Sequence, residues 1–273
     1  SQEDRLGIRR ASGILIRAVA PILNDKRSEP PVISVSDDGA VVVPLLGGHR
    51  GANRIARDIA GALDATAAVT TAGDVALGIA LDEPPPGWRL ATTGNAKAAM
   101  AALLSGAGAR VTGDAAGEAS WLAGLPHGDG VTISCSAGPA PTGDGAGLVY
   151  HPQKAVLGVG CARNCPPPEL EALAMRQLEE AGIAPGALAA VATVDLKADE
   201  PAVIELACKL GVPLRLFTAA ELEAETLRSE TPSDVVFAEI GTHGVAENAA
   251  LACAGRAARL VRAKAKTGMA AAA

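Results

Sequence analysis

Four short stretches of the 273-residue chain combine glycine or proline with ionisable side chains. They are 47–53 (GGHRGAN), 158–165 (GVGCARNC), 195–201 (DLKADEP) and 239–251 (EIGTHGVAENAAL). Glycine lets a ligand approach the backbone closely, and amide groups at the start of a helix can hold an anion. We interpret all four as strand-end loops. Together they offer bases, cations and backbone donors, the groups that a hydrolytic or anion-binding site needs.

Two of these stretches place a histidine between glycines. A histidine with an ordinary pKa near 6.5 can accept a proton at neutral pH. His49, which follows Gly47 and Gly48, is therefore our first candidate for a general base. His243 is the reserve, because Glu247 lies four residues later and could orient its ring if a helix starts by residue 243. A tight turn with an exposed histidine, and a capped helix with a solvated His–Glu pair, are the alternative interpretations.

The other two stretches supply cations and carboxylates. Lys197 ends an apolar strand pattern, so we expect its ammonium group to point into a cleft and to act at the reacting centre. Arg163, shortly after Gly160, is a candidate anion contact, although a pure turn is an equal alternative. Asp199 and Glu200 could bind substrate, but acidic side chains at a helix start are also ordinary caps.

Three further polar residues complete the set of candidate substrate contacts: Arg50, Asn53 and Thr242. We interpret His127 and His151 as parts of a loop and a linker. Cys161 and Cys165 have no second pair of ligands at zinc spacing, so we expect no metal and no disulfide.

The hydrophobic pattern indicates the elements that must position these residues. We predict helices over residues 13–23, 51–63, 95–105, 166–182, 201–211 and 245–255. We predict a hairpin over 32–46 and strands over 67–71, 131–136, 154–160, 187–196, 212–217 and 258–263.

This alternation predicts an α/β fold of two small lobes with mostly parallel sheets. The lobes are residues 1–72 and 148–273, and a less certain middle segment, 73–147, joins them. Ligands bind beyond the carboxyl ends of parallel strands. We therefore expect the four stretches to meet in a cleft between the lobes.

Composition narrows the class of protein. A net charge of -6 and a pI near 5.3 argue against a nucleic-acid partner, which would need a basic face. No apolar run is long enough to cross a membrane, and the first residues do not resemble a signal peptide. Five irregularly spaced cysteines are typical of a reduced, cytoplasmic protein.

Several stretches resemble a known family. GILIRAVAPIL, VVVPLLGGHRGAN and AVTTAGD resemble the N-terminal domain of the CbiG family, the cobalt-precorrin-5A hydrolases of cobalamin biosynthesis. LGVGCARNC, VDLKADEP, GTHGVAENAAL and AKTGMA resemble the C-terminal domain of that family, which also occurs alone as the CobE proteins. Residues 73–150 match the family poorly.

The resemblance implies a reaction that opens the δ-lactone on ring A of a tetrapyrrole and releases acetaldehyde without a cofactor. It implies partners as well: a precorrin intermediate, other corrin-pathway enzymes, and a fused or associated precorrin-3B C(17)-methyltransferase. A homodimer is a further expectation. Two alternatives to the hydrolase stay open, namely a non-catalytic CobE-like carrier and an unrelated α/β binding domain.

Overall fold

The computed structural model describes residues 7–9, 12–25, 29–48, 51–71, 76–92, 95–140 and 147–273. The chain divides into two compact units. The first contains residues 1–85, 93–110 and 120–132, and the second contains 86–92, 111–119 and 133–273. The α/β class is confirmed, with three sheets that are partly parallel. The division into residues 1–72, 73–147 and 148–273 stays a prediction.

The first sheet lies in the first unit and has the order β1-β2-β3-β4. Its strands are β1 (Gly7–Arg9), β2 (Val32–Val35), β3 (Val41–Leu46) and β4 (Thr66–Ala67). The hairpin predicted over 32–46 is confirmed, because β2 and β3 pair antiparallel. The strand predicted over 67–71 is wrong for most of its length, since β4 ends at Ala67.

Two helices accompany this sheet, α1 (Ser12–Val19) and α2 (Ala52–Leu63), and a 3-10 turn, Ala20–Ile22, follows α1. Helix α2 confirms the prediction over 51–63. It buries Ala52, Ala56 and Ala60, which recur every fourth residue and so form one face of the helix. This small-residue face packs on Ile33 and Val42 of the sheet.

The middle sheet has the order β5-β8-β7-β6. Its strands are β5 (Trp88–Leu90), β6 (Ala109–Thr112), β7 (Val131–Cys135) and β8 (Leu148–Pro152). Helix α4 (Ala96–Leu104) and 3-10 turns Ala116–Glu118 and Ser120–Leu122 belong to the same stretch of sequence. The predicted helix over 95–105 and strand over 131–136 are confirmed. β8 was missed, although all five of its residues are buried.

The sheet of the second unit has the order β11-β10-β9-β13-β12. Its strands are β9 (Ala155–Cys161), β10 (Leu188–Val194), β11 (Leu214–Phe217), β12 (Ala265–Lys266) and β13 (Ala270–Ala272). β9, β10 and β11 are parallel, whereas β13 is antiparallel to β9. The carboxyl ends of β9 and β10 therefore lie at the same edge of the sheet.

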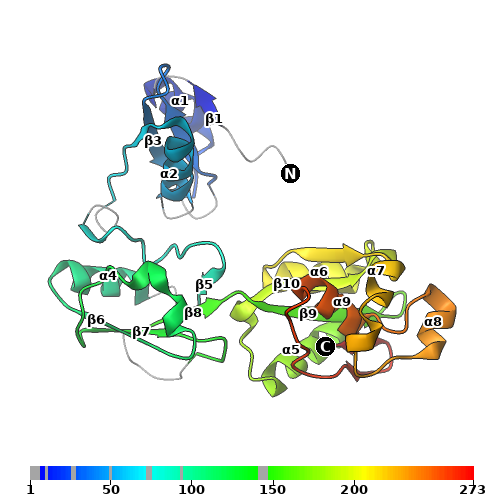
Figure 1. Cartoon of the computed structure of the whole chain (residues 1–273). Helices are drawn as coiled ribbons and strands as arrows, with labels where there is room; N and C mark the ends of the chain where they lie inside the picture. Colours follow the sequence, from blue (N-terminus) through cyan, green and yellow to red (C-terminus); the bar gives the residue numbers. More distant parts are fainter. Residues whose placement is uncertain are drawn as a thin grey trace. The chain divides into compact units, whose positions relative to one another are not determined.

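Helices cover both faces of this sheet (Figure 1). They are α5 (Pro167–Glu180), α6 (Pro201–Leu210), α7 (Ala219–Glu223) and α9 (Ala246–Ala254), whereas α8 (Asp234–Ile240) contributes no residue to either buried layer. Alternation along β10 explains the two layers, since Val191 packs with α5 and α6 whereas Ala192 packs with α9. Gly158 lets α9 pack closely on β9, because a Cβ there would lie 1.8 Å from the Ala246 carbonyl oxygen.

Short 3-10 turns complete the unit at Pro185–Ala187, Asp195–Lys197 and Thr226–Arg228. The strand predicted over 258–263 is wrong, because this segment forms no strand. Its side chains bind α5 instead: Arg262 donates to Gln177 Oε1 (3.3 Å) and to the Glu180 carbonyl oxygen (3.4 Å). The chain then enters the sheet as β12 and β13. Among the described residues, no helix has the length and apolar character that a membrane span requires.

Candidate functional site

A cavity of about 500 Å³ lies beyond the carboxyl ends of β9 and β10. Three of the four predicted stretches contribute residues to its lining, and the convergence of all four stays a prediction. The lining residues are Gly160–Arg163, Val194, Leu196, Lys197, Val236, Glu239, Ile240, Val245, Ala246, Lys264 and 266–271. This is the place where the topology of a parallel sheet leads one to expect a ligand.

Lys197 is the most unusual residue of this cavity. It ends the turn after β10, and its side chain is only 14% exposed. Its Nζ lies 3.9 Å from Glu200 Oε2, and within the described parts of the chain it donates no hydrogen bond. A largely buried ammonium without an acceptor is costly. An anionic ligand in the cavity would supply the missing acceptor.

Glu200 lies outside the cavity lining, although we predicted it as a substrate contact. It is 1% exposed, and its Oε1 has no hydrogen-bond partner among the described residues. Its Oε2 lies 3.7 Å from Arg163 Nη1 as well as near Lys197. Glu200 is thus a buried counter-charge for two cations at the cavity.

Arg163 lines the cavity but is held by protein groups. It forms an ion pair with Asp199 and donates to the Leu196 carbonyl oxygen (2.7 Å). The hydrogen bond with Asp199 raises the pKa of Arg163, and the same bond lowers the pKa of Asp199. Asp199 itself is exposed and does not line the cavity. It therefore orients Arg163 and is not placed to meet a ligand there.

Cys161 faces the same cavity, and Cys165 lies behind it as a buried thiol. Burial raises the pKa of Cys161 to about 11, and the charge of Lys197 only partly opposes this. Its thiol is therefore neutral at pH 7 and a poor nucleophile. The described residues contain no cluster of three or more potential metal ligands.

Lys264 and Lys266 line the cavity, and the sequence analysis missed both. Lys264 Nζ donates to the Thr231 carbonyl oxygen (2.6 Å), and burial lowers its pKa. Lys266 is exposed at the rim. Lys266 belongs to the AKTGMA stretch, and Lys264 lies just before it. Only the pairing of β13 with β9 brings them to the strand ends.

The predicted pairing of His243 with Glu247 is wrong. Helix α9 begins at Ala246, so His243 precedes the helix and does not share a face with Glu247. Its Nδ1 lies 2.8 Å from Glu223 Oε1 instead. Thr242 is fully buried and donates to the Gly244 carbonyl oxygen (3.1 Å). None of these side chains lines the cavity.

Glu247 holds two loops in place. It is buried, and it accepts hydrogen bonds from the backbone nitrogens of Glu230, Thr231 and Lys264 (2.7–3.0 Å) and from Thr231 Oγ1 (2.8 Å). Burial opposes ionisation, but the hydrogen bonds from Lys264 and Thr231 outweigh it and lower the pKa of Glu247. The carboxylate is therefore charged at neutral pH and has a structural role.

Glu247→Ala should destabilise the protein by on the order of 3 kcal/mol, because several buried donors lose a charged acceptor. Urea unfolding of the variant and of Glu205→Ala, an exposed control, measures the difference. Since the folded pKa is lowered, this stability is complete above the ordinary glutamate pKa of about 4.3. It is lost as the pH falls through the folded pKa. Equal stability of Glu247→Ala and the parent would contradict this role.

The fourth predicted stretch, 47–53, belongs to the first compact unit. Gly47 has φ of 77°, and a Cβ there would lie 3.0 Å from Pro31 Cα, so glycine is required sterically. Asn53 is buried, packs against Gly48 and donates to Thr71 Oγ1 (2.7 Å). His49 and Arg50 lie outside the described residues.

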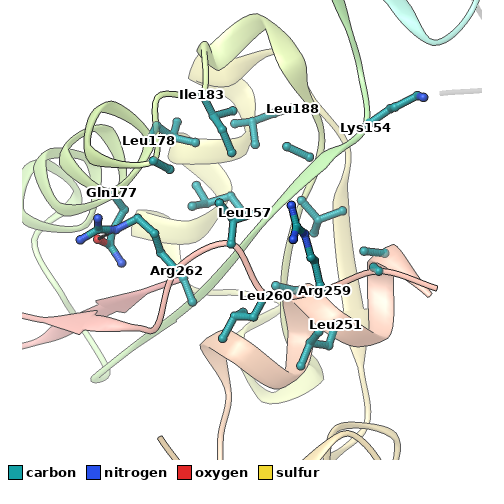
Figure 2. Close-up of a pocket in the computed structure, with 18 residues that line it drawn as sticks. Lys154, Leu157, Gln177, Leu178, Ile183, Leu188, Leu251, Arg259, Leu260 and Arg262 are labelled. Carbon is teal, nitrogen blue, oxygen red and sulfur yellow. Dashed lines mark hydrogen bonds between the residues drawn. The ribbon is translucent and has the colours of Figure 1, made fainter. Parts of the chain in front are cut away.

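A second cavity of about 140 Å³ is lined by α5, the starts of β9 and β10, and the 258–262 segment (Figure 2). Figure 2 shows Leu157, Leu178 and Leu188 around it, with Arg262 beside Gln177. Its walls are mostly aliphatic; Arg262 and Lys154 are paired with Glu180 and Glu118, and its third cation, Arg259, is exposed. We therefore take the cavity around Lys197 as the candidate site.

Comparison with known proteins agrees with the sequence resemblance. A model described as "Cobalamin synthesis G C-terminus" matches residues 155–273, and "Cobalamin synthesis G N-terminal" matches residues 2–74. A cobalt-precorrin-5A hydrolase of Priestia megaterium is 30% identical over 267 residues, covering 89% of this chain and 71% of that protein. The chain belongs to the CbiG family.

Two further relatives are similar to this CbiG-family chain. A cobalt-precorrin-5A hydrolase of Salmonella typhimurium is 35% identical over 235 residues, covering 78% of this chain and 65% of that protein. Protein CobE of a Sinorhizobium species is 50% identical over 117 residues, covering 43% of this chain and 71% of that protein. Every lining residue of the cavity around Lys197 falls within the match to the CbiG C-terminus. The chain is thus a homologue of cobalt-precorrin-5A hydrolase in cobalamin biosynthesis.

Proposed function

We propose that this protein hydrolyses the ring A δ-lactone of cobalt-precorrin-5A, or of its metal-free counterpart, and releases acetaldehyde. The observation that carries the proposal is the Lys197 ammonium, which is largely buried at the cavity and donates no hydrogen bond within the described residues. An oxyanion or a peripheral carboxylate of the substrate provides the acceptor that it lacks.

The cavity suits the substrate in two further ways. Arg163, Lys264 and Lys266 add positive charge around it, which favours a macrocycle with many carboxylates. Val236, Ile240 and Met269 form apolar walls, which favour the face of a conjugated ring system. A volume of about 500 Å³ accommodates part of such a macrocycle.

The reaction needs no oxidant. A water oxygen bonds to the lactone carbonyl carbon, the general base takes its proton, and the ring C–O bond breaks to free a carboxylate. The alkoxide forms the C=O bond of acetaldehyde as the C–C bond between its carbon and the macrocycle breaks. The electron pair of that bond stays on the macrocycle, which takes up the proton that the base removed from water. His49 is our proposed base, because an imidazole has the right pKa and its glycine neighbours leave room.

A CobE-like carrier is the second candidate. The observation that favours it is that none of the three described histidines, His127, His151 and His243, lines the cavity, so this cavity could bind a precorrin without opening it. The 50% identity to Protein CobE supports the same alternative. The other corrin-pathway enzymes, a fused or associated methyltransferase and a homodimer stay predictions.

Incubation with cobalt-precorrin-5A separates the two functions. Acetaldehyde can be followed continuously with alcohol dehydrogenase and NADH. We expect many turnovers per protein from either the cobalt or the metal-free lactone. Tight binding of both lactones without acetaldehyde would leave the carrier as the function.

A further inference from the structure

The short helix α8 forms one wall of the cavity yet buries none of its own side chains. Val236 and Ile240 lie four residues apart, on one side of the helix, and line the cavity together with the exposed carboxylate Glu239. Val235 and Phe237 are exposed. In Figure 1, α8 (orange) stands apart from the sheet of its unit. Because a seven-residue helix is unstable alone, its position depends on a few anchoring contacts.

These contacts converge on His243. Its carbonyl oxygen accepts a hydrogen bond from the nitrogen of Ser233, the residue before α8 (2.8 Å). Its ring stacks on Phe237, with ring centroids 4.3 Å apart and planes 25° from parallel. Its Nε2 lies 3.6 Å from Oδ1 of the exposed Asp234. His243 thus touches the residue before the helix, its first residue and its middle.

Glu223, the last residue of α7, fixes His243 in turn. The backbone nitrogen of His243 donates to Glu223 Oε2 (2.8 Å), and Nδ1 lies 2.8 Å from Oε1. Thr226 Oγ1 donates to the same carboxylate (2.9 Å). The bonds from His243 and Thr226 hold the pKa of Glu223 below its ordinary range, so the carboxylate is charged at neutral pH. α8 is therefore connected to the body of its unit through Glu223, His243 and Phe237.

We propose that His243 is a positioning residue, which fixes the helix that carries Val236 and Ile240 into the cavity wall and thereby sets the affinity for a ligand with a broad apolar face. That the ligand is a tetrapyrrole rests on the proposed function. That His243 holds α8 in place does not. His243 does not line the cavity, so its loss raises KM and leaves kcat nearly unchanged. Loss of a general base in the same position would instead lower kcat and leave KM nearly unchanged.

Amide hydrogen exchange of α8 and binding of uroporphyrin, a carboxylate-rich tetrapyrrole, test the inference on the full chain. His243→Ala and Phe237→Ala should each speed exchange of the α8 amides by about tenfold or more, with α9 unchanged. Both should weaken uroporphyrin binding several-fold. Val235→Ala is the matched control, since Val235 is on the same helix, is 69% exposed and does not line the cavity. Phe237→Ala keeps the test valid if His243→Ala fails to fold.

Unchanged α8 exchange in both variants would overturn the proposal. Faster exchange with unchanged uroporphyrin affinity and unchanged KM for cobalt-precorrin-5A would overturn it too, because the helix would then not shape the site. A parent protein that binds no tetrapyrrole would contradict the proposed function instead. The exchange measurement would then still decide whether His243 anchors α8.

Discussion

Lys197→Ala weakens the binding of cobalt-precorrin-5A by about tenfold to a hundredfold, as measured by absorbance titration of the macrocycle. The variant removes the one largely buried cation of the cavity that donates no hydrogen bond to the described residues. A hydrogen bond to a charged group is worth about 1.5–3 kcal/mol, which corresponds to this change in affinity. Turnover falls as well if the ammonium stabilises the lactone oxyanion.

Two controls make this result specific. Lys209→Ala removes an exposed lysine of α6 that pairs with Glu171 of α5, and neither residue lines the cavity. This variant should bind the macrocycle as tightly as the parent protein does. Lys197→Ala also leaves Glu200 with Arg163 as its remaining cation, 3.7 Å away. The double variant Lys197→Ala/Glu200→Gln removes that buried charge. If the double variant regained full affinity, or if Lys197→Ala bound and turned over normally, Lys197 would not contact the substrate.

His49→Ala lowers acetaldehyde release by at least about a hundredfold while the protein still folds and binds the macrocycle. Loss of a general base costs about a hundredfold to ten-thousandfold in rate. The coupled acetaldehyde assay measures turnover, and absorbance titration shows that binding survives. His127→Ala, at an exposed position of the first unit, is the matched histidine control and should turn over normally.

Three other outcomes would change the role assigned to His49. Normal turnover by His49→Ala with an inactive His243→Ala would move the base to the second unit and would also contradict a pure positioning role for His243. Full activity of both variants would mean that neither histidine is the base. Loss of binding in His49→Ala would make His49 a substrate contact.

The sequence predicted that Lys197 points into a cavity because the pattern that indicates it lies within a few consecutive residues. An apolar strand, a cation and a helix start follow one another within a few residues, and the carboxyl ends of parallel strands are where ligands bind. The same reasoning applies to residues 160–163, which follow β9. It does not apply to the stretch 239–251, which follows helix α8 and not a strand, so that Glu239 and Ile240 line the cavity from a helix that the sequence did not predict.

Sequence reasoning failed where a contact depended on tertiary structure. His243 and Glu247 have helical spacing, but the helix starts three residues too late for them to share a face. Residues 258–263 (ARLVRA) were predicted as a strand, yet they form none and Arg262 binds α5 instead. Lys264 and Lys266 reach the cavity only because β13 returns antiparallel beside β9. No local pattern specifies such a pairing.

The most direct test of the hydrolase is the mass of the macrocycle after incubation with the parent protein in water labelled with heavy oxygen. Hydrolysis predicts a product that has lost the two-carbon fragment and carries one labelled oxygen in its freed ring A carboxylate. A macrocycle recovered with its original mass, although it was bound by the protein, would contradict hydrolysis and identify a carrier.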